Sequence, residues 1–328
     1  MTTPQETLAG IGEAPFTELR VARKTALARD IWGFELRHPH GEALLPFTAG
    51  AHLTVQVPGG ARRNYSLCSA PADTHAYQIA IKRDATGRGG SIALADAVRE
   101  GDLLAVSAPR NNFALHERAP SYLFIAGGIG ITPIMSMVRH LLTSGRGQFQ
   151  LIYCTRDADH TAFADVLRAP ELVGRVRIHH DRGDAAQAFD FWPVFESPGK
   201  VHVYCCGPRG LMDTVADMSG HWPSGAIHFE SFGVDATAFS TNTAFTVRLQ
   251  RSGTTVPVRA DQTLLEALRA GGHAVASSCE SGTCGSCRTG LLAGEAEHRD
   301  MVLTEDERAS QIMVCVSRAH SAELVLDL

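Results

Sequence analysis

Three cysteines fall within nine residues near the C-terminal end of the chain, in the stretch SCESGTCGSCR (278–288). Cys279, Cys284 and Cys287 are spaced as Cys-x4-Cys-x2-Cys, and Cys315 follows after 27 further residues. Four thiolates in this order are the ligand pattern of a 2Fe-2S cluster with plant-type spacing. The alternative is a structural zinc site, but such sites usually combine two Cys-x2-Cys units. We therefore expect these four side chains to bind iron, which moves single electrons.

A second candidate site lies in the stretch RRNYSLCSAP (62–71). Alternation along a predicted strand places Arg63 and Tyr65 on the same face, with Ser66 next to them. A cation, a flat aromatic ring and a small hydroxyl suit the phosphate, the ring and the N5 edge of a flavin. A tyrosine on a barrel strand is more often an ordinary core or surface residue, so this stretch alone leaves both interpretations open.

Twenty residues further on, KRDATGRGGS (82–91) precedes a helical stretch, IALADAVREG. Free backbone amides at the start of a helix form an anion site, so a phosphate could bind there. The alternative is an ordinary glycine-rich hairpin loop. The residues expected to bind a cofactor in this segment are Lys82, Gly89, Gly90 and Ser91.

The stretch FIAGGIGITP (124–133) follows a predicted strand and opens a predicted helix. It is a dinucleotide-type loop that lacks the third glycine of GxGxxG. Thr132 is expected to be the N-cap and Pro133 the first helical residue. Gly128, Gly130 and Thr132 are therefore candidate nucleotide-binding residues.

Two further strand ends complete the candidate nucleotide site. After the second strand, Arg156 could accept a 2'-phosphate, whereas Asp157 could bind a ribose 2'-hydroxyl, so the two residues favour different cofactors. In YCCGPRGLM (204–212), Cys206 and Gly207 lie at the carboxyl end of another predicted parallel strand, where open α/β sheets bind ligands. The alternative is that Cys206 is a small core residue.

These stretches belong to three segments that differ in their pattern of apolar and polar residues. With 328 residues, the chain is too long for one ordinary core. Residues 16–115 alternate between apolar and polar positions and predict an antiparallel β-barrel or sandwich that carries the candidate flavin residues. Residues 116–233 alternate strands and helices and predict a doubly wound α/β nucleotide domain. After a tail (1–15) and a linker (234–244), the remaining segment is expected to be a ferredoxin domain of α+β, β-grasp type (245–328).

Composition limits the classes of partner. The chain is 44% hydrophobic and 20% charged, and its net charge of -5 lacks the basic excess that nucleic-acid binding demands. Residues 119–138 carry no charge, but Gly and Thr-Pro in the middle predict a buried strand and a helix in place of a membrane span. Residues 1–16 lack the pattern of a secretory signal, so we expect a cytoplasmic protein with no membrane partner.

Taken together and in this order, RxYS, GRGGS, GGxGxTP, CCGP, HFESFG and the four cysteines resemble the phthalate dioxygenase reductase family. These proteins are similar to ferredoxin-NADP reductases and carry a C-terminal ferredoxin domain. The resemblance implies FMN, a 2Fe-2S cluster and NADH as the donor, with a separate Rieske-type oxygenase as the partner. Vanillate and related O-demethylase reductases share this layout, so the aromatic substrate of the oxygenase stays open.

The resemblance also implies roles for individual residues. Arg63 would lie near the FMN phosphate, Tyr65 against the ring and Ser66 at N5. Cys206 would lie beside the nicotinamide, and Phe232 would cover the flavin until the nicotinamide displaces it. The family motif has Thr where this chain has Asn64, which alters the expected phosphate contacts. The expected catalytic residues are Ser66, Cys206 and Phe232, and the expected cofactor-binding residues also include Asn64, Arg156 and Gly207.

The sequence therefore predicts a monomeric, NADH-dependent flavin and iron-sulfur oxidoreductase that serves a Rieske-type oxygenase in the breakdown of aromatic compounds. A flavin is needed because nicotinamide delivers electron pairs, whereas an iron-sulfur centre accepts one electron at a time. One alternative is an FAD-dependent diaphorase or a reductase for another acceptor. The other alternative is a non-enzymatic iron-sulfur or zinc sensor.

Overall fold

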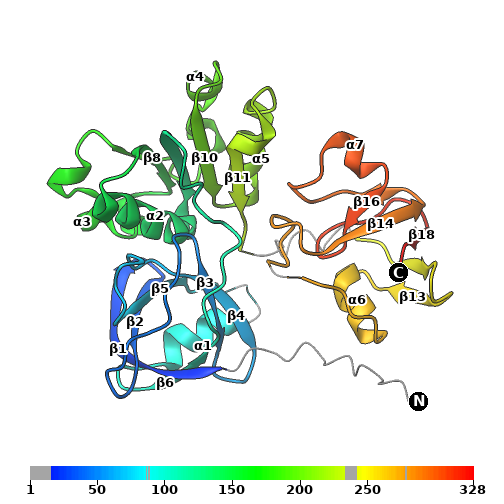
Figure 1. Cartoon of the computed structure of the whole chain (residues 1–328), viewed down its shortest axis with the longest axis horizontal. Helices are drawn as coiled ribbons and strands as arrows, with labels where there is room; N and C mark the ends of the chain where they lie inside the picture. The colour runs from blue at the N-terminus through cyan, green and yellow to red at the C-terminus, as the bar shows by residue number, and fades with distance from the viewer. Residues whose placement is uncertain (1–15, 86, 88, 233–241, 278) are drawn as a thin grey trace, which may run out of the picture.

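The computed structural model describes residues 16–85, 87, 89–232, 242–277 and 279–328. Three large sheets of different type follow one another along the described chain (Figure 1), and the third unit also contains a two-stranded sheet. The expected multidomain class, with a barrel, a doubly wound domain and a ferredoxin-type domain, is confirmed. The predicted tail (1–15) and most of the predicted linker (234–244) lie outside the described residues.

The first unit is a six-stranded antiparallel sheet in the order β4-β3-β6-β1-β2-β5. A bridge between Leu67 and Ile79 joins the chain after β4 to β5, so the sheet closes on itself. The alternating burial of β1 and β2 explains the closure, because the buried positions fill one common core. The elements are β1 (Thr17–Ala28), β2 (Ile31–Arg37), β3 (His52–Gln56), β4 (Arg62–Ser66), β5 (Tyr77–Lys82), α1 (Gly90–Ala97) and β6 (Leu103–Val106).

The second unit is a five-stranded parallel sheet in the order β11-β10-β7-β8-β9, with helices packed against it (Figure 1). Its central strand β7 is almost wholly buried, as expected for a parallel strand that is covered on both faces. The strands are β7 (Ser121–Gly127), β8 (Gln148–Thr155), β9 (Val176–His180), β10 (Val201–Cys206) and β11 (Ile227–Glu230). The α-helices are α2 (Ile131–Ser144), α3 (Ala164–Leu167), α4 (Trp192–Phe195) and α5 (Arg209–Met218). Short 3-10 helices cover Gly128–Gly130, Ala158–His160, Pro170–Leu172, Ala185–Gln187 and Ser224–Ala226.

The uncharged stretch 119–138 forms β7, the glycine turn and the first half of α2. Among the residues that the structure describes, no helix is long and apolar enough to cross a membrane. The expected N-cap is wrong: α2 begins at Ile131 with Gly130 as its cap, so Thr132 lies inside the first turn. The Thr132 hydroxyl donates to the carbonyl oxygen of Ile129 at 3.0 Å, which keeps the side chain within the turn.

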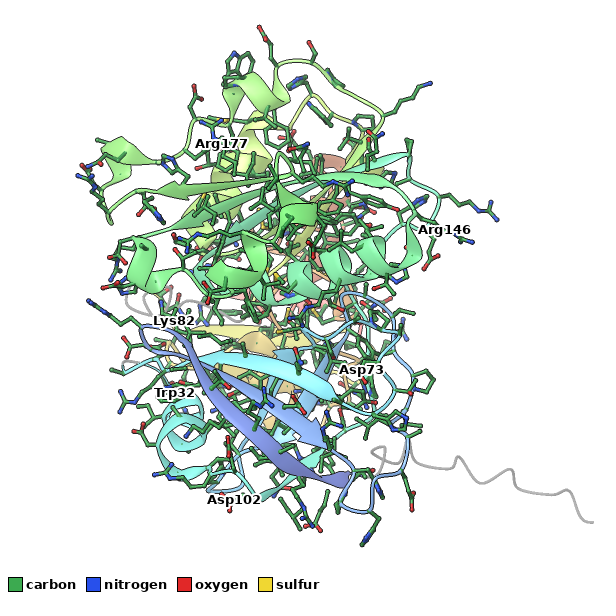
Figure 2. All side chains as sticks on the ribbon, turned by 90° about the vertical axis from the view of Figure 1, so that its left-hand side faces the viewer. Trp32, Asp73, Lys82, Asp102, Arg146 and Arg177 are labelled. Carbon is green, nitrogen blue, oxygen red and sulfur yellow. The ribbon has the colours of Figure 1, made fainter. Side chains whose placement is uncertain are left out.

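The barrel and the nucleotide domain share one hydrophobic core. Barrel residues such as Ile31 and Cys68 belong to the same buried cluster as Phe124 and Met135 of the nucleotide domain. Arg139 of α2 reaches into the barrel, where it donates to the carbonyl oxygen of Cys68 at 2.6 Å and to Gln78 Oε1 at 2.7 Å. These two domains therefore form one packed unit, which Figure 2 shows with the nucleotide domain above the barrel.

The third unit has a separate core. Its five-stranded sheet has the order β13-β12-β18-β14-β16, and β12 pairs antiparallel with β13 as a hairpin. Helix α6 begins with a capping box between Thr263 and Glu266. The elements are β12 (Phe245–Leu249), β13 (Thr255–Val258), α6 (Leu264–Ala270), β14 (Arg288–Ala293), β15 (Ala296–Glu297), α7 (Glu305–Arg308), β16 (Gln311–Met313), β17 (Arg318–Ala319) and β18 (Glu323–Leu326).

Candidate functional site

The four predicted metal ligands meet in the third unit as two pairs. The Cys284 thiol donates to Cys279 and lowers the pKa of Cys279, and Cys315 lowers the pKa of Cys287 in the same way. Among the described residues, no three Cys, His, Asp or Glu side chains converge on one point, as a single zinc ion would require. Two thiol pairs instead fit two iron atoms with two sulfur ligands each, so the residues fit a 2Fe-2S cluster.

The loop that carries these thiols turns sharply. Gly282 and Gly285 have φ angles of 77° and 80°, which favour glycine. A Cβ on Gly282 would also lie 2.7 Å from Val316 Cγ2, so a larger residue would clash there. The amide of Ser281 donates to Cys279 Sγ at 3.4 Å, which stabilises a thiolate at that position. The loop is therefore shaped around its sulfur atoms.

The barrel strand β4 presents the first predicted flavin residues. Arg63 and Tyr65 lie on one face of β4 and are partly buried, and burial raises the pKa of Tyr65 to about 12, so its hydroxyl stays protonated. Asn64 lies on the opposite face, where its Oδ1 accepts a hydrogen bond from Thr54 Oγ1 at 2.8 Å. The structure thus brings Arg63 and Tyr65 together, but not the side chain of Asn64.

The glycine segment before α1 lies against Arg63. A Cβ on Gly90 would be 3.0 Å from Arg63 Cγ and Nε, so the guanidinium stem passes directly over the start of the helix. Gly89 has a φ angle of 82°, and no atom lies within 4 Å of its Cβ position. Ser91 Oγ accepts a hydrogen bond from the Asp84 amide at 3.1 Å. A guanidinium beside the amides at a helix N-terminus is a geometry that binds phosphate.

Lys82 is the last residue of β5 and is exposed. In Figure 2 it lies where the barrel borders the nucleotide domain. The contact between Arg63 and Gly90 does not include it.

The two nucleotide motifs pack against each other at the carboxyl edge of the parallel sheet. A Cβ on Gly130 would lie 2.1 Å from the carbonyl oxygen of Cys206, and one on Gly127 would lie 2.6 Å from Pro208 Cδ. Gly130 is thus required by the close packing of GGxG on CCGP. Gly128 has open space around its Cβ position and a φ angle of 52°, so its backbone is accessible to a ligand.

At the end of β8, the side chains of Arg156 and Asp157, which favour different nucleotides, have different surroundings. The carboxylate of Asp157 accepts hydrogen bonds from the amide of His160 at 3.0 Å and from its Nδ1 at 2.6 Å, and the His160 side chain lowers the pKa of Asp157. Arg156 is exposed at the same edge. Asp157 therefore caps the turn that follows β8 as an anion beside Arg156.

Side chains from the first two units meet at the ends of β4, β10 and β11. Glu230, the last residue of β11, is buried, and its carboxyl forms a hydrogen bond with Ser66. Burial is the main cause that raises the pKa of Glu230, and it raises the pKa of Cys206 well above the usual value, so Cys206 remains a thiol. Phe232 follows two residues after Glu230 and is 47% exposed, as an aromatic that stacks on a ligand requires.

The third unit contributes to the same place. The charge of Cys279 acts on both Glu230 and His52, which is the cross-strand neighbour of Ser66. Ser281 Oγ, two residues after Cys279, donates to the carbonyl oxygen of Ser231 at 2.8 Å, so the cluster loop lies beside the residue that follows Glu230. This arrangement can pass electrons from a nucleotide site through a flavin site to the cluster.

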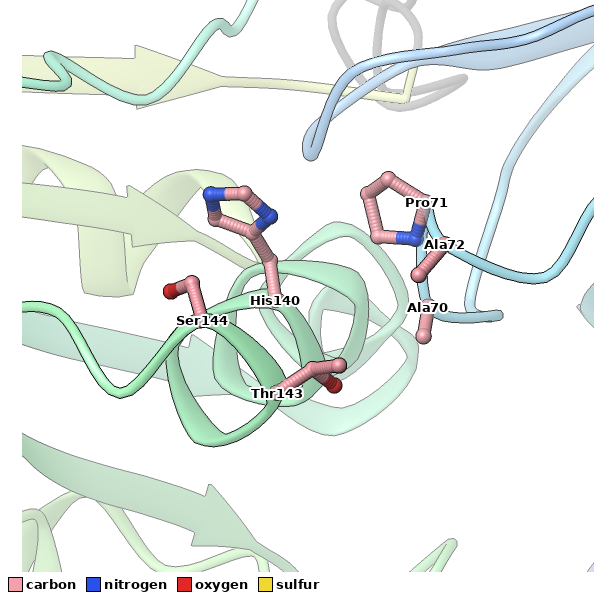
Figure 3. Close-up of a pocket in the computed structure, with 6 residues that line it drawn as sticks. All are labelled: Ala70, Pro71, Ala72, His140, Thr143 and Ser144. Carbon is pink, nitrogen blue, oxygen red and sulfur yellow. The ribbon is translucent and has the colours of Figure 1, made fainter.

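Sequence reasoning missed Glu230, although the stretch HFESFG contains it. A carboxylate that ends a short strand of a parallel sheet is a signal that could have identified it, because ligands bind at such ends. A cavity of about 320 Å³ lies away from this site, between Ala70–Ala72 and the end of α2 near His140 (Figure 3). None of the predicted site residues lines it.

Comparison with known proteins agrees with this geometry. Residues 18–115 match the oxidoreductase FAD-binding domain, residues 124–181 the oxidoreductase NAD-binding domain, and residues 247–320 the 2Fe-2S iron-sulfur cluster binding domain. The chain is 58% identical to phthalate dioxygenase reductase of Burkholderia cepacia, over the whole of both chains. It is 57% identical to the phthalate 4,5-dioxygenase oxygenase reductase subunit of Pseudomonas putida, over 95% of this chain and 97% of that one.

A solved structure of phthalate dioxygenase reductase, described as modular for electron transfer from pyridine nucleotides to [2Fe-2S], is 58% identical with a TM-score of 0.74. The match covers 95% of this chain and 98% of that one. The flavin, NAD(H) and 2Fe-2S domains predicted from the sequence are thereby confirmed. The chain belongs to the phthalate dioxygenase reductase family, whose members are electron-transferring oxidoreductases.

Proposed function

We propose that this chain takes electrons from NADH, through FMN and a 2Fe-2S cluster, to a separate Rieske-type oxygenase that acts on an aromatic acid such as phthalate. One observation carries the proposal: Glu230 at the end of β11 faces Ser66 of the barrel, and Ser281 of the cluster loop donates through Oγ to the carbonyl oxygen of the adjacent Ser231 at 2.8 Å. When bound, the flavin and the cluster supply the conversion of an electron pair into single electrons. Two curated relatives that are 58% and 57% identical to this chain are named as phthalate dioxygenase reductase and as the reductase subunit of phthalate 4,5-dioxygenase, which supports the choice of partner.

The protein groups hold and orient these cofactors. We assign Arg63 and the amides at the start of α1 to the flavin phosphate, and Tyr65 to its ring. The compact contact between Arg63 and Gly90 supports FMN, whose terminal phosphate fits one such site. Ser66 and Glu230 share a hydrogen bond, which fixes the serine hydroxyl for its expected role at N5. Buried Cys206 supplies an uncharged, water-free wall beside the nicotinamide.

The negative charge of Asp157, next to Arg156, supports NADH as the donor. Asp157 is held as a carboxylate by His160, and a carboxylate there favours a ribose hydroxyl over a 2'-phosphate. We therefore expect kcat/KM to be higher with NADH than with NADPH. Asp157→Asn should narrow that ratio, and an unchanged ratio would contradict the assignment. The same proposal includes a cytoplasmic location and a monomeric state. Sedimentation of the purified protein tests the monomeric state.

The deciding experiment is an anaerobic NADH titration of the purified protein, followed by visible absorbance. If flavin and iron-sulfur bands bleach together at about three electrons per chain, the relay is established. Release of the flavin and chromatography against FMN and FAD then identifies it, and FAD would favour the diaphorase alternative. Coloured protein that NADH does not bleach would indicate a sensor and overturn the proposal.

A further inference from the structure

The ferredoxin domain has its own hydrophobic core, separate from the core that the barrel and the nucleotide domain share. It therefore needs specific contacts to hold its cluster loop against the flavin site. Among the described residues, side-chain hydrogen bonds of Ser281 and Arg209 join this domain to the nucleotide domain at the carboxyl edge of the parallel sheet.

The first of these hydrogen bonds comes from the cluster loop itself. Ser281 Oγ donates to the carbonyl oxygen of Ser231 at 2.8 Å, across 50 residues of sequence. Ser281 is only 6% exposed, and its amide donates to Cys279 Sγ at 3.4 Å. Ser231 directly follows Glu230, which interacts with Ser66. One serine thus contacts both a cluster ligand and the strand end that carries the flavin-side carboxyl.

The second hydrogen bond lies one loop away. Arg209, the first residue of α5, donates through Nη1 to the carbonyl oxygen of Arg299 at 2.7 Å. Its Nε bonds to Asp213 at 2.7 Å, which fixes the guanidinium on the helix. Because Arg209 follows the CCGP motif closely, this contact also anchors the ferredoxin domain at the nucleotide-binding edge.

The contact surface between the nucleotide domain and the ferredoxin domain is incompletely filled. A cavity of about 270 Å³ lies between residues of the nucleotide domain, including His228, and residues of the ferredoxin domain, including Thr283 and Met301. A contact with a cavity of this size lacks part of the dispersion and hydrophobic stabilisation of a close-packed interface. Met301 packs against a second buried cluster of the nucleotide domain, and the two directional polar contacts fix the orientation that this apolar contact alone does not define.

We propose that Ser281 and Arg209 are positioning residues that dock the ferredoxin domain on the nucleotide domain and so set the distance between the flavin site and the cluster. The inference rests on the proposed electron relay and adds the contacts that set the rate of electron transfer from the flavin to the cluster. Electron tunnelling slows steeply with distance, so any loss of the docked state slows the transfer. A net hydrogen bond of about 1 kcal/mol corresponds to about a fivefold change in the docking equilibrium.

The test compares Ser281→Ala, Arg209→Ala and the double variant with the wild-type holoenzyme. After rapid mixing with NADH, the rate at which the flavin absorbance bleaches is expected to stay unchanged. The later bleaching of the iron-sulfur bands should slow by up to about fivefold in each single variant and about 25-fold in the double variant. Cluster content and the electron paramagnetic resonance signal should match the wild type, which excludes a damaged cluster.

Matched controls separate docking from the general loss of a side chain. Ser277→Ala removes a nearby hydroxyl that bonds within the ferredoxin domain, to Glu280 at 2.8 Å, and Arg251→Ala removes an exposed arginine paired with Asp327. Both should behave as the wild type. Small-angle X-ray scattering, which needs no NADH, should give a larger radius of gyration for the double variant only.

Unchanged scattering together with unchanged iron-sulfur bleaching in the double variant would overturn the inference. Failure of the proposed function looks different, because NADH would then not bleach the flavin bands of the wild type. In that case the scattering comparison alone decides the docking role of Ser281 and Arg209.

Discussion

At the residue scale, two glycines of one loop carry different constraints. Gly130 has an ordinary φ angle of -61°, but its Cβ position lies 2.1 Å from the carbonyl oxygen of Cys206. Gly130→Ala must displace the CCGP backbone, so we expect it to cost about 2–3 kcal/mol of stability. Gly128→Ala meets no atom and strains only the backbone, by about 1 kcal/mol. Thermal unfolding measures both, and a larger loss for Gly128→Ala would contradict the packing argument.

Arg63 gives a residue-scale test of the phosphate site. Arg63→Met keeps the aliphatic stem over Gly90 but removes the charge, so FMN should bind at least about tenfold more weakly, as expected for a lost charged hydrogen bond. Arg62→Met is the matched control, because Arg62 lies on the other face of β4 and stacks on Phe16 at 4.7 Å. Fluorescence titration of flavin-free protein gives both dissociation constants. Equal weakening in the two variants would remove Arg63 from the site.

Sequence reasoning identified the residues whose chemical role follows from their spacing along the chain. The four cysteines and the glycine loops belong to this group, because a loop around a ligand leaves a local pattern. Glu230 was not identified, since its meaning depends on burial and on Ser66, which lies 164 positions earlier. For Asn64, no local pattern indicates that Thr54 on the neighbouring strand donates a hydrogen bond to its side-chain oxygen.

At the element scale, β10, β11 and the chain before β7 bring three histidines together. The rings of His116 and His202 stack with centroids 4.4 Å apart, and His202 Nδ1 lies 3.0 Å from His228 Nε2. Tyr204 stacks on His228 at 4.4 Å, and its hydroxyl accepts the amide of His116. Burial, followed by the neighbouring histidines, lowers the pKa of His228 to about 4, so the ring is neutral in the folded protein at neutral pH.

This stack predicts a loss of stability in acid. The unfolded chain binds a proton at His228 near its ordinary pKa of 6.5, whereas the folded chain binds it only near 4. Stability should therefore fall as the pH drops from about 6.5 to 4, by about 1–2 kcal/mol after allowance for partial exposure. His228→Gln should show a smaller fall than the wild type in thermal unfolding across this range. Parallel curves for the two proteins would refute the contribution of His228.

Elements with strong local patterns were predicted well, and elements decided by distant contacts were not. The strands β7 and β10, the hairpin β12–β13 and helix α6 follow from their periodicity and caps. Helix α3 covers only Ala164–Leu167, because Phe163 has a φ angle of 58° and packs into the shared core, which no local pattern shows. The cap of α2 was misplaced since the glycine turn continues directly into the helix.

At the scale of the whole molecule, changes in the pattern of apolar and polar residues indicated three domains. The contacts between these domains could not be predicted from that pattern. Arg139 joins the first two domains through a carbonyl and an amide that no local pattern marks. The Ser281–Ser231 hydrogen bond joins the third domain in a comparable way. Such contacts depend on the distances between folded surfaces, and a sequence pattern describes only neighbours along one chain segment.

The order of the domains in electron transfer gives the last prediction. Cys287→Ser replaces a buried cluster ligand with an oxygen that binds iron less well, and it leaves the barrel and the nucleotide domain intact. NADH-dependent reduction of cytochrome c should fall by at least about tenfold, while reduction of ferricyanide, which can occur at the flavin, should stay within about twofold. Cys154→Ser, which changes a cysteine outside the cluster, should retain both activities. Equal loss of both activities in Cys287→Ser would mean that the cluster and the flavin do not act in series, because a relay with the cluster last must spare the step before it.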